Sequence, residues 1–389
     1  MTNRTTEELR MSWAEACALR LTRHFLAGTA PLGGIPEAAS ALCGAHAQIM
    51  SGAEMSLGMR VPGTTRTDVQ AALWKDRSLV KTYGPRGTVH LLAAEELPLW
   101  VGALSCVPRP PSALPHALLT DRQLTEVVDA IEAAVEDGEL TVEELGDEVT
   151  GRTGPWAADL ALPAFSGAWP RWRAALQTAA NRGVICFGPN QGRKVTYTSP
   201  SRWVPGFRPM DSGIASAEIL RRYLRAYGPA TPQQFAQWLG APRRWSATLF
   251  EAITDELIPV DLEGVKAWTT APAVSVAPSS HRGLRLLPYF DPYVIGCHPR
   301  DAVYPGLAAA RALSGGQAGN VPVVLIDGVV AGVWHQRRSG RRLDIRVEPF
   351  APLSAGRRAE LTAQAERIGE ILEGTPALTI GVVDAGKHL

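Results

Sequence analysis

The stretch from Arg66 to Leu92, RTDVQAALWKDRSLVKTYGPRGTVHLL, decides the fold that we expect. Its first ten residues favour a helix, because threonine, aspartate and glutamine near the beginning suit a first helical turn. Two β-rich runs follow at 79–83 and 88–92, and the Gly84-Pro85-Arg86-Gly87 segment between them predicts a hairpin turn. A helix that leads into a hairpin is the second half of a winged helix.

The same order of three helices and a hairpin can be followed three times along the chain. Proline-rich linkers at 108–115 and 205–209 separate the repeats. The helices that we expect span 6–25, 36–47 and 66–75 in the first repeat, 121–136, a segment from Thr141, and 169–182 in the second, and 216–225, a segment from Thr231, and 242–256 in the third.

The chain changes character after the third repeat. Strands are expected there at 284–290, 321–326, 329–334, 343–347 and 377–382, with one helix at 356–372. We therefore predict an α+β protein of three tandem winged-helix domains, at 1–115, 116–210 and 211–389, of which the third carries a C-terminal β extension.

Composition narrows the class of protein. The 389 residues are 46% hydrophobic, which is enough for several cores, and no segment approaches the roughly 18 apolar residues of a membrane helix. The charged N-terminus does not resemble a signal peptide, so we expect a cytoplasmic protein without a membrane partner. Five scattered cysteines favour buried, reduced thiols over a disulfide framework or a zinc site. Nucleotide-binding and metalloprotease motifs are absent, so we expect no cofactor and no metal.

Charge is distributed unevenly along the chain. Residues 121–148 contain eleven acidic residues and one basic residue, a local charge of −10, so the remainder carries +11 although the whole chain is at +1. The densest basic cluster is QRRSGRR at 336–342, expected at the tip of a hairpin, where Arg337, Arg338, Arg341 and Arg342 would repel one another without a counter-ion. DNA phosphates are such a counter-ion, whereas the simpler interpretation is a solvated turn.

The stretch ALCGAHAQIM, residues 41–50, contains the candidate chemistry. His46 and Gln48 are two positions apart at the expected end of a helix, so both can face one site only if the helix ends or unwinds there. A neutral imidazole can hold a water molecule and accept its proton, and its ordinary pKa near about 6.5 suits neutral pH. The alternative, favoured by spacing alone, is a histidine that packs at a helix end.

Four further positions are candidates for DNA contact or catalysis. Arg86, Thr88 and His90 are suited to phosphate contact from the first hairpin, although Arg86 can equally occupy the turn with His90 packed below it. Asp291, in LLPYFDPY at 286–293, could stabilise a developing positive charge, but an aspartate before proline is also an ordinary turn residue. Most of the eleven tryptophans are expected in the cores.

The stretches ALCGAHAQIM, RGTVH and LLPYFDPY, together with the three winged-helix repeats, resemble the AlkZ/YcaQ group of bacterial DNA glycosylases. The resemblance implies a C-shaped molecule with a concave DNA-binding face, and hydrolysis of the N-glycosidic bond of bulky N7-alkylguanine adducts in duplex DNA. It implies a monofunctional, cofactor-free monomer associated with the nucleoid. His46 and Gln48 match the two catalytic positions, where the first is more commonly Gln. Variants with His resemble members linked to self-resistance against alkylating antibiotics of the trioxacarcin type.

Two other functions remain compatible with the residues. A winged-helix transcriptional regulator would bind duplex DNA without catalysis, usually as a dimer that reads a palindrome. The third expected helix of each repeat is apolar or mixed, as in the WRAAL segment at 172–176, and no heptad pattern offers a dimer seam. An inactive scaffold of the same fold is the third possibility. A stable dimer in gel filtration would favour the regulator.

Overall fold

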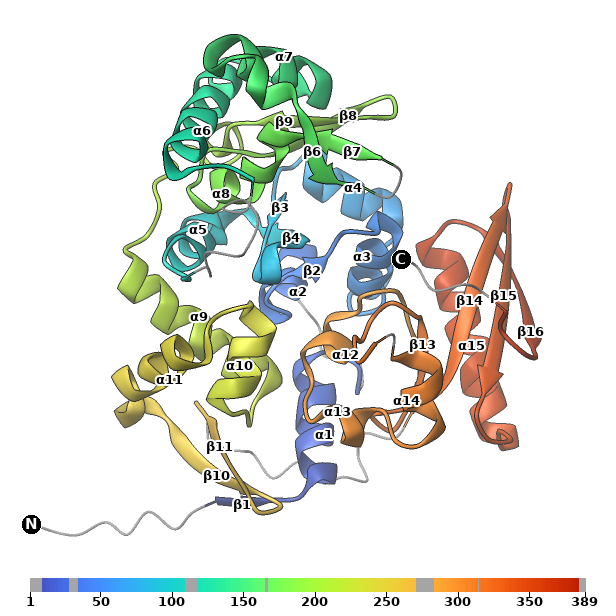
Figure 1. Ribbon diagram of the computed structural model, residues 1–389. Helices are drawn as coiled ribbons and strands as arrows, with labels where there is room; N and C mark the ends of the chain where they lie inside the picture. Colours follow the sequence, from blue (N-terminus) through green and yellow to red (C-terminus); the bar gives the residue numbers. More distant parts are fainter. Residues whose placement is uncertain are drawn as a thin grey trace, which may run out of the picture.

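The computed structural model describes residues 9–27, 34–108, 118–164, 167–270, 283–313 and 315–384. It confirms the α+β class, with helices and antiparallel hairpins alternating along the chain (Figure 1). None of the helices in these ranges is both long and apolar enough to span a membrane.

One order of elements occurs three times: helix, short strand, two helices, hairpin. The first repeat contains α2 (Ile35–Ala41), β2 (Ala45–His46), α3 (Met50–Gly58), α4 (Arg66–Trp74), β3 (Leu79–Tyr83) and β4 (Val89–Ala93). The second contains α6 (Asp121–Val135), β5 (Leu140–Thr141), α7 (Val142–Thr153), α8 (Leu176–Asn181), β8 (Cys186–Gln191) and β9 (Lys194–Thr198). The third contains α9 (Ser212–Tyr227), α10 (Pro232–Leu239), α11 (Arg243–Ala252), β10 (Ile258–Leu262) and β11 (Val265–Thr269).

Strand pairing is the same in all three repeats. The short strand pairs with the second strand of the hairpin, giving the orders β2-β4-β3 and β5-β9-β8. In the third repeat the short strand is reduced to one bridge, between Ala230 and Trp268 of β11. Helices followed by a hairpin with this strand order are what the winged-helix prediction requires.

The prediction of a first helix at 6–25 is wrong in its bounds and in assigning that helix to the first repeat. The chain forms β1 (Leu9–Met11), which runs parallel to β10, and then α1 (Trp13–Arg23). Ser12 caps α1, because its side chain accepts the Glu15 amide while the Glu15 carboxylate accepts the Ser12 amide. Because α1 precedes the first repeat, the three helices of that repeat are α2, α3 and α4, and the sequence interpretation missed α3.

The helix expected at 36–47 ends early. Helix α2 stops at Ala41, because Cys43 and Gly44 adopt positive φ angles of 56° and 97°. A Cβ at Gly44 would lie 2.7 Å from a methyl carbon of Leu92 on β4, so the tight approach of β2 to β4 also requires glycine here. His46 therefore lies on a strand, and Gln48 in the bend that follows it.

The helix expected at 169–182 is wrong in its first half. That part forms β7 (Ala168–Pro170), which pairs with β6 (Leu160–Pro163), and a 3-10 turn before α8. The sequence predicts the turn of the second wing at 189–192, whereas the structure places it between Gln191 and Lys194, around Gly192. Trp172, Trp203 and Trp334 are buried as expected, whereas Trp169 on β7 is 38% exposed.

The C-terminal part contains a five-stranded sheet covered by one long helix. Its order is β12 (Leu284–Leu287), β13 (Val323–Ile326), β14 (Val329–Ser339), β15 (Arg342–Pro349) and β16 (Thr375–Ile380), and α15 (Ala355–Ile371) packs on it (Figure 1). Three short helices, α12 (Pro292–Gly296), α13 (Arg300–Val303) and α14 (Leu307–Ala312), lie between β12 and β13. The sequence interpretation missed this insert, together with α5 (Leu97–Ser105).

The cores show how the parts of the chain are joined. The second repeat has its own core, built around residues such as Val127, Leu145 and Trp172. The largest core instead combines α5, α9 and α10 with the sheet and the insert that follow, so the two ends of the chain share one interior. The domain boundaries at 115 and 210 stay predictions, and most of the first linker lies outside the described residues.

Candidate active site

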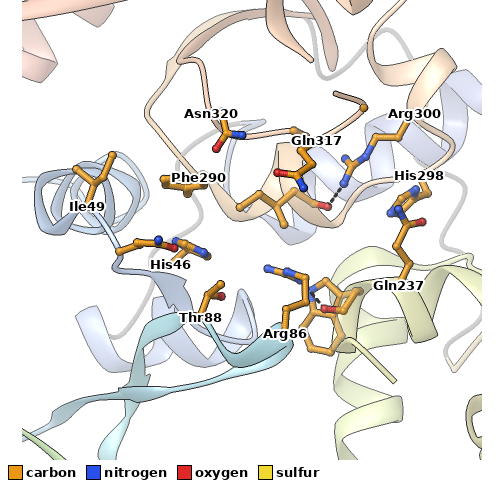
Figure 2. Close-up of a pocket in the computed structure, with 15 residues that line it drawn as sticks. His46, Ile49, Arg86, Thr88, Gln237, Phe290, His298, Arg300, Gln317 and Asn320 are labelled. Atoms are coloured by element: carbon orange, nitrogen blue, oxygen red, sulfur yellow. Dashed lines mark hydrogen bonds between the residues drawn. The ribbon is translucent and has the colours of Figure 1, made fainter. Parts of the chain in front are cut away.

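A pocket lies where the first repeat, the third repeat and the insert after β12 meet. Its volume is about 820 Å³. The described residues that line it are His46, Gln48, Ile49, Arg86, Thr88, Gln237, Trp238, Phe290, Ile295, His298, Arg300, Gly316, Gln317, Ala318 and Asn320. Figure 2 shows His46 on one side of this pocket, His298, Arg300 and Gln237 on the opposite side, and Arg86 between them.

His46 is held in the pocket wall by aromatic contacts. It is 5% exposed, and its ring stacks on Phe290 with a centroid distance of 4.5 Å and an interplanar angle of 24°. The ring of His90, directly opposite on β4, contacts its edge at 5.0 Å. Its Nδ1 is buried and makes no hydrogen bond to any described residue. The ring is therefore fixed by packing, with one nitrogen unpaired.

Burial, and to a smaller extent the charge of Arg86, lower the pKa of His46 to about 3. The expectation of an ordinary histidine pKa is therefore wrong for the protein without DNA, because the ring lies away from water and near a guanidinium. The imidazole is neutral at physiological pH. In this state it can hold a water molecule, but it is a weak proton acceptor.

Gln48 reaches the same pocket from the bend between β2 and α3. Its side chain is exposed, in contrast to that of His46. On a helix, His46 and Gln48 would point in different directions. They are not on a helix, because α2 ends at Ala41, before both residues. The structure thus brings the two motif residues to one wall.

Arg86 and Thr88 line the pocket from the first hairpin. Arg86 has a φ of 60° and donates from Nη1 to the Trp238 carbonyl oxygen on α10. Burial lowers the pKa of this guanidinium to about 10, so Arg86 is still cationic at neutral pH. Thr88 donates from Oγ1 to the Pro85 carbonyl oxygen at 3.0 Å.

His90 does not line the pocket. It is 4% exposed behind His46, and its Nδ1 donates to the Thr88 carbonyl oxygen at 2.8 Å. Burial holds its pKa well below the usual value. This position favours the packed interpretation of His90 over phosphate contact. A Cβ at Gly84 would lie 2.7 Å from the His90 ring, so the turn glycine makes room for it.

Asp291 also lies behind the wall rather than in it. Its carboxylate is completely buried and forms an ion pair with Arg60, with Oδ1 2.8 Å from Nη2. Arg60 Nη1 and Ser56 Oγ both donate to the other oxygen at 2.9 Å, and the Tyr293 amide donates to Oδ1. Asp291 therefore neutralises Arg60 and caps α12, as a turn residue does. A direct role beside a developing cation does not fit this placement.

Comparison with known proteins places this site in a family. The family model described as DNA glycosylase AlkZ-like matches residues 39–371. The chain belongs to the AlkZ-like DNA glycosylase family. This AlkZ-like chain is 32% identical to an interstrand DNA cross-link repair glycosylase of Streptomyces sahachiroi over 340 residues, which cover 84% of this chain and 88% of the relative. The solved structure of Streptomyces sahachiroi DNA glycosylase AlkZ covers 96% of the chain, and the chain covers all of it, with a TM-score of 0.79 at 26% identity.

The basic hairpin of the AlkZ-like chain does not contribute to the pocket. Arg337, Arg338, Arg341 and Arg342 are exposed at the end of β14 and the start of β15. Arg338 donates to the Leu372 carbonyl oxygen at 2.7 Å and Arg342 to Asp344 at 2.6 Å. Arg337 and Arg342 line a separate cavity of about 420 Å³. Two of the four arginines are thus held by the protein.

Sequence reasoning missed the far wall of the AlkZ-like pocket. His298 is 5% exposed with a buried, unpaired Nε2, and burial lowers its pKa to about 3. Arg300 donates to the carbonyl oxygens of Val294, Ile295 and Cys297 at the end of α12. No sequence motif marks these residues. They follow His46 by about 250 positions in the sequence, and only the fold brings them to the pocket. Across the described residues no group of three or more metal-ligating side chains comes together.

Proposed function

We propose that this AlkZ-like glycosylase hydrolyses the N-glycosidic bond of bulky N7-alkylguanine adducts in duplex DNA, with His46 and Gln48 as its catalytic residues. The observation that supports this proposal is the convergence of both motif residues on one wall of a pocket of about 820 Å³. The family match favours a glycosylase over a transcriptional regulator or an inactive scaffold of the same fold.

The chemistry required of these residues is modest. An N7-alkylguanine is already cationic, so when the C1′–N9 bond breaks its electron pair neutralises the departing base. The deoxyribose is left as an oxocarbenium-like cation, and water forms the new C1′–O bond. The Gln48 amide and the neutral His46 imidazole hold that water, and His46 receives its proton as the bond forms.

We further propose that the enzyme is monofunctional. Lysine is absent from the described residues that line the pocket, so no side-chain amine is placed there to attack C1′ and form a Schiff base. Water is therefore the nucleophile. The protein would act as a monomer and without a cofactor.

Adduct size and biological role belong to the same proposal. The relative from Streptomyces sahachiroi is named as an interstrand DNA cross-link repair glycosylase, which makes cross-links a second class of substrate to test. His46 in place of the commoner glutamine suggests self-resistance to an alkylating antibiotic. Adducts of the trioxacarcin type are the first substrates we would test.

DNA contact is proposed at two places. Arg86 and Thr88 face the pocket and are suited to the backbone beside the reacting sugar. The exposed arginines of the β14–β15 hairpin are suited to more distant phosphates. His90, buried below the first hairpin, supports these contacts only by packing.

The test is release of modified base from a duplex that carries one bulky N7-alkylguanine. Native protein should release the base, and His46→Ala and Gln48→Ala should each lower the rate about 100-fold or more while DNA binding is retained. Gln233→Ala is the matched control, because Gln233 is an exposed amide on α10 that does not line the pocket. A native protein that releases no base from single adducts or cross-links, yet binds undamaged DNA selectively, would contradict the proposal.

A further inference from the structure

The charges around the pocket are unbalanced. Among the described residues that line it, Arg86 and Arg300 are guanidinium groups, and aspartate and glutamate are absent. Asp291 lies behind the wall and is already paired with Arg60. Like charges that face one cavity repel one another, and an anion entering from solution relieves that repulsion.

Arg86 retains donors for such an anion. Only its Nη1 has a partner, the Trp238 carbonyl oxygen, so Nε and Nη2 make no hydrogen bond within the part of the chain that the structure describes. That hydrogen bond holds the guanidinium against α10, and the Arg86 backbone is also close to this helix, since a Cβ at Gly240 would lie only 3.0 Å from the Arg86 Cα. A fixed guanidinium with two open donors matches the oxygen pair of a phosphate.

The opposite wall supplies a second unpaired group. His298 is buried with Nε2 unpaired, and it lines the same pocket beside Arg300. Arg300 is fixed by three carbonyl oxygens at the end of α12, so it contributes its charge without swinging away. Figure 2 shows Arg86 between this wall and His46.

We propose that the space bounded by Arg86, His298 and Arg300 is a phosphate-binding subsite, which takes the phosphodiester group adjoining the target nucleotide. This inference rests on the proposed function, because every deoxyribose placed at His46 carries a phosphate on each side. The bound phosphate supplies the negative charge that the pocket wall lacks.

This subsite has a consequence for the reaction. A sugar cation that forms beside an uncompensated Arg86 is destabilised by repulsion, and the same guanidinium opposes proton acceptance by His46. Once a phosphate pairs with Arg86, both effects are offset. The DNA backbone therefore completes the electrostatics of the site.

The experiment replaces single phosphodiesters by neutral methylphosphonates around the adduct, with native protein and with Arg86→Gln. At one flanking position the replacement should slow base release by native protein about tenfold. The same replacement should hardly change the rate of base release by Arg86→Gln, because that variant has already lost the contact. A methylphosphonate placed several nucleotides away is the control and should affect both proteins equally. Arg86→Lys keeps the positive charge but lacks the paired N–H donors of the guanidinium. The methylphosphonate should slow its base release by an intermediate factor.

Three outcomes decide the matter. Equal losses for native protein and Arg86→Gln at every position would overturn the subsite while leaving the glycosylase proposal intact. If native protein releases no base at all, the proposed function fails, and the same duplexes measured by binding anisotropy still test whether one phosphate couples to Arg86. If Arg86→Gln does not fold, native protein is measured alone. Its base release must then be slowed by a methylphosphonate at one flanking position and not at the others.

Discussion

At the scale of single residues, the site depends on how His46 is surrounded. Its ring lies between Phe290 and His90, and its pKa is lowered to about 3, first by burial and then by Arg86. Sequence alone identified the residue but not this environment, because Phe290 comes from a segment more than 240 positions away. A candidate catalytic side chain can be predicted from a short motif, whereas its pKa depends on the fold around it.

Phe290 offers a test of how much the stacked ring matters. Its φ of 55° is unfavourable for any residue with a Cβ, so Phe290→Gly removes the ring and relieves the backbone, whereas Phe290→Ala removes only the ring. Both variants should lose about tenfold in kcat through a less fixed His46. In urea unfolding, the glycine variant should be about 1 kcal/mol more stable than the alanine variant.

Phe290→Tyr keeps the ring and is the matched control for this pair. If alanine and glycine variants retained the native kcat while tyrosine did too, the stacked ring would have no part in positioning His46.

At the scale of elements, the buried Arg60–Asp291 pair joins the end of α3 to the start of α12. Asp291→Asn leaves the Arg60 charge buried without its partner, and the free energy of unfolding should fall by about 3 to 5 kcal/mol. Urea denaturation measures this change. Base release by the protein that remains folded should also fall, because α12 follows directly on Phe290.

The double variant Arg60→Met with Asp291→Leu is the control for this ion pair. Removing both charges should cost less than the sum of the two single substitutions, because neither charge is left alone. Additive losses would mean that the two side chains stabilise the fold independently.

Elements with local signals were predictable from the sequence. Helix α4 and the hairpin β3–β4 have their start and turn residues within a few positions, and Thr231 with Gln234 marks α10. The elements that the sequence did not predict depend on contacts with residues far away in the chain. Strand β1 exists because β10 pairs with it, and α12 to α14 are short helices held by the core that both ends of the chain share. The far wall of the pocket fell within that unpredicted insert.

At the scale of the whole molecule, the acidic second repeat and the pocket are kept apart. Helices α6 and α7 lie at one outer end in Figure 1, whereas the pocket lies among β2, α10 and α12. Because α6 and α7 are acidic, their distance from the pocket weakens their repulsion of DNA at the place where we propose that DNA binds. The C-shaped outline and the monomeric state stay predictions.

Acid sensitivity is a property of the entire fold. Burial lowers the pKa of His24 and His90 well below the usual value and that of His46 and His298 to about 3. Between about pH 6.5 and the lowered values only the unfolded chain takes up these protons, so stability falls as pH falls. Each histidine contributes about 1.4 kcal/mol per pH unit in that window.

Urea unfolding at several pH values between about 7.5 and 5 checks this prediction. The free energy of unfolding should fall steeply below about pH 6.5, and His46→Gln should lower the proton uptake on unfolding by about one. A flat profile across this range would contradict the buried, neutral state of these histidines.

The pocket draws its walls from residues 46–49 near one end of the chain and from residues up to Asn320 near the other. A ribosome that has synthesised the first 280 residues therefore carries His46 and Gln48 without His298 and Arg300 opposite them. The nascent polypeptide holds the motif that we propose to be catalytic in an incomplete pocket, and the pocket is completed only after Asn320 has been translated.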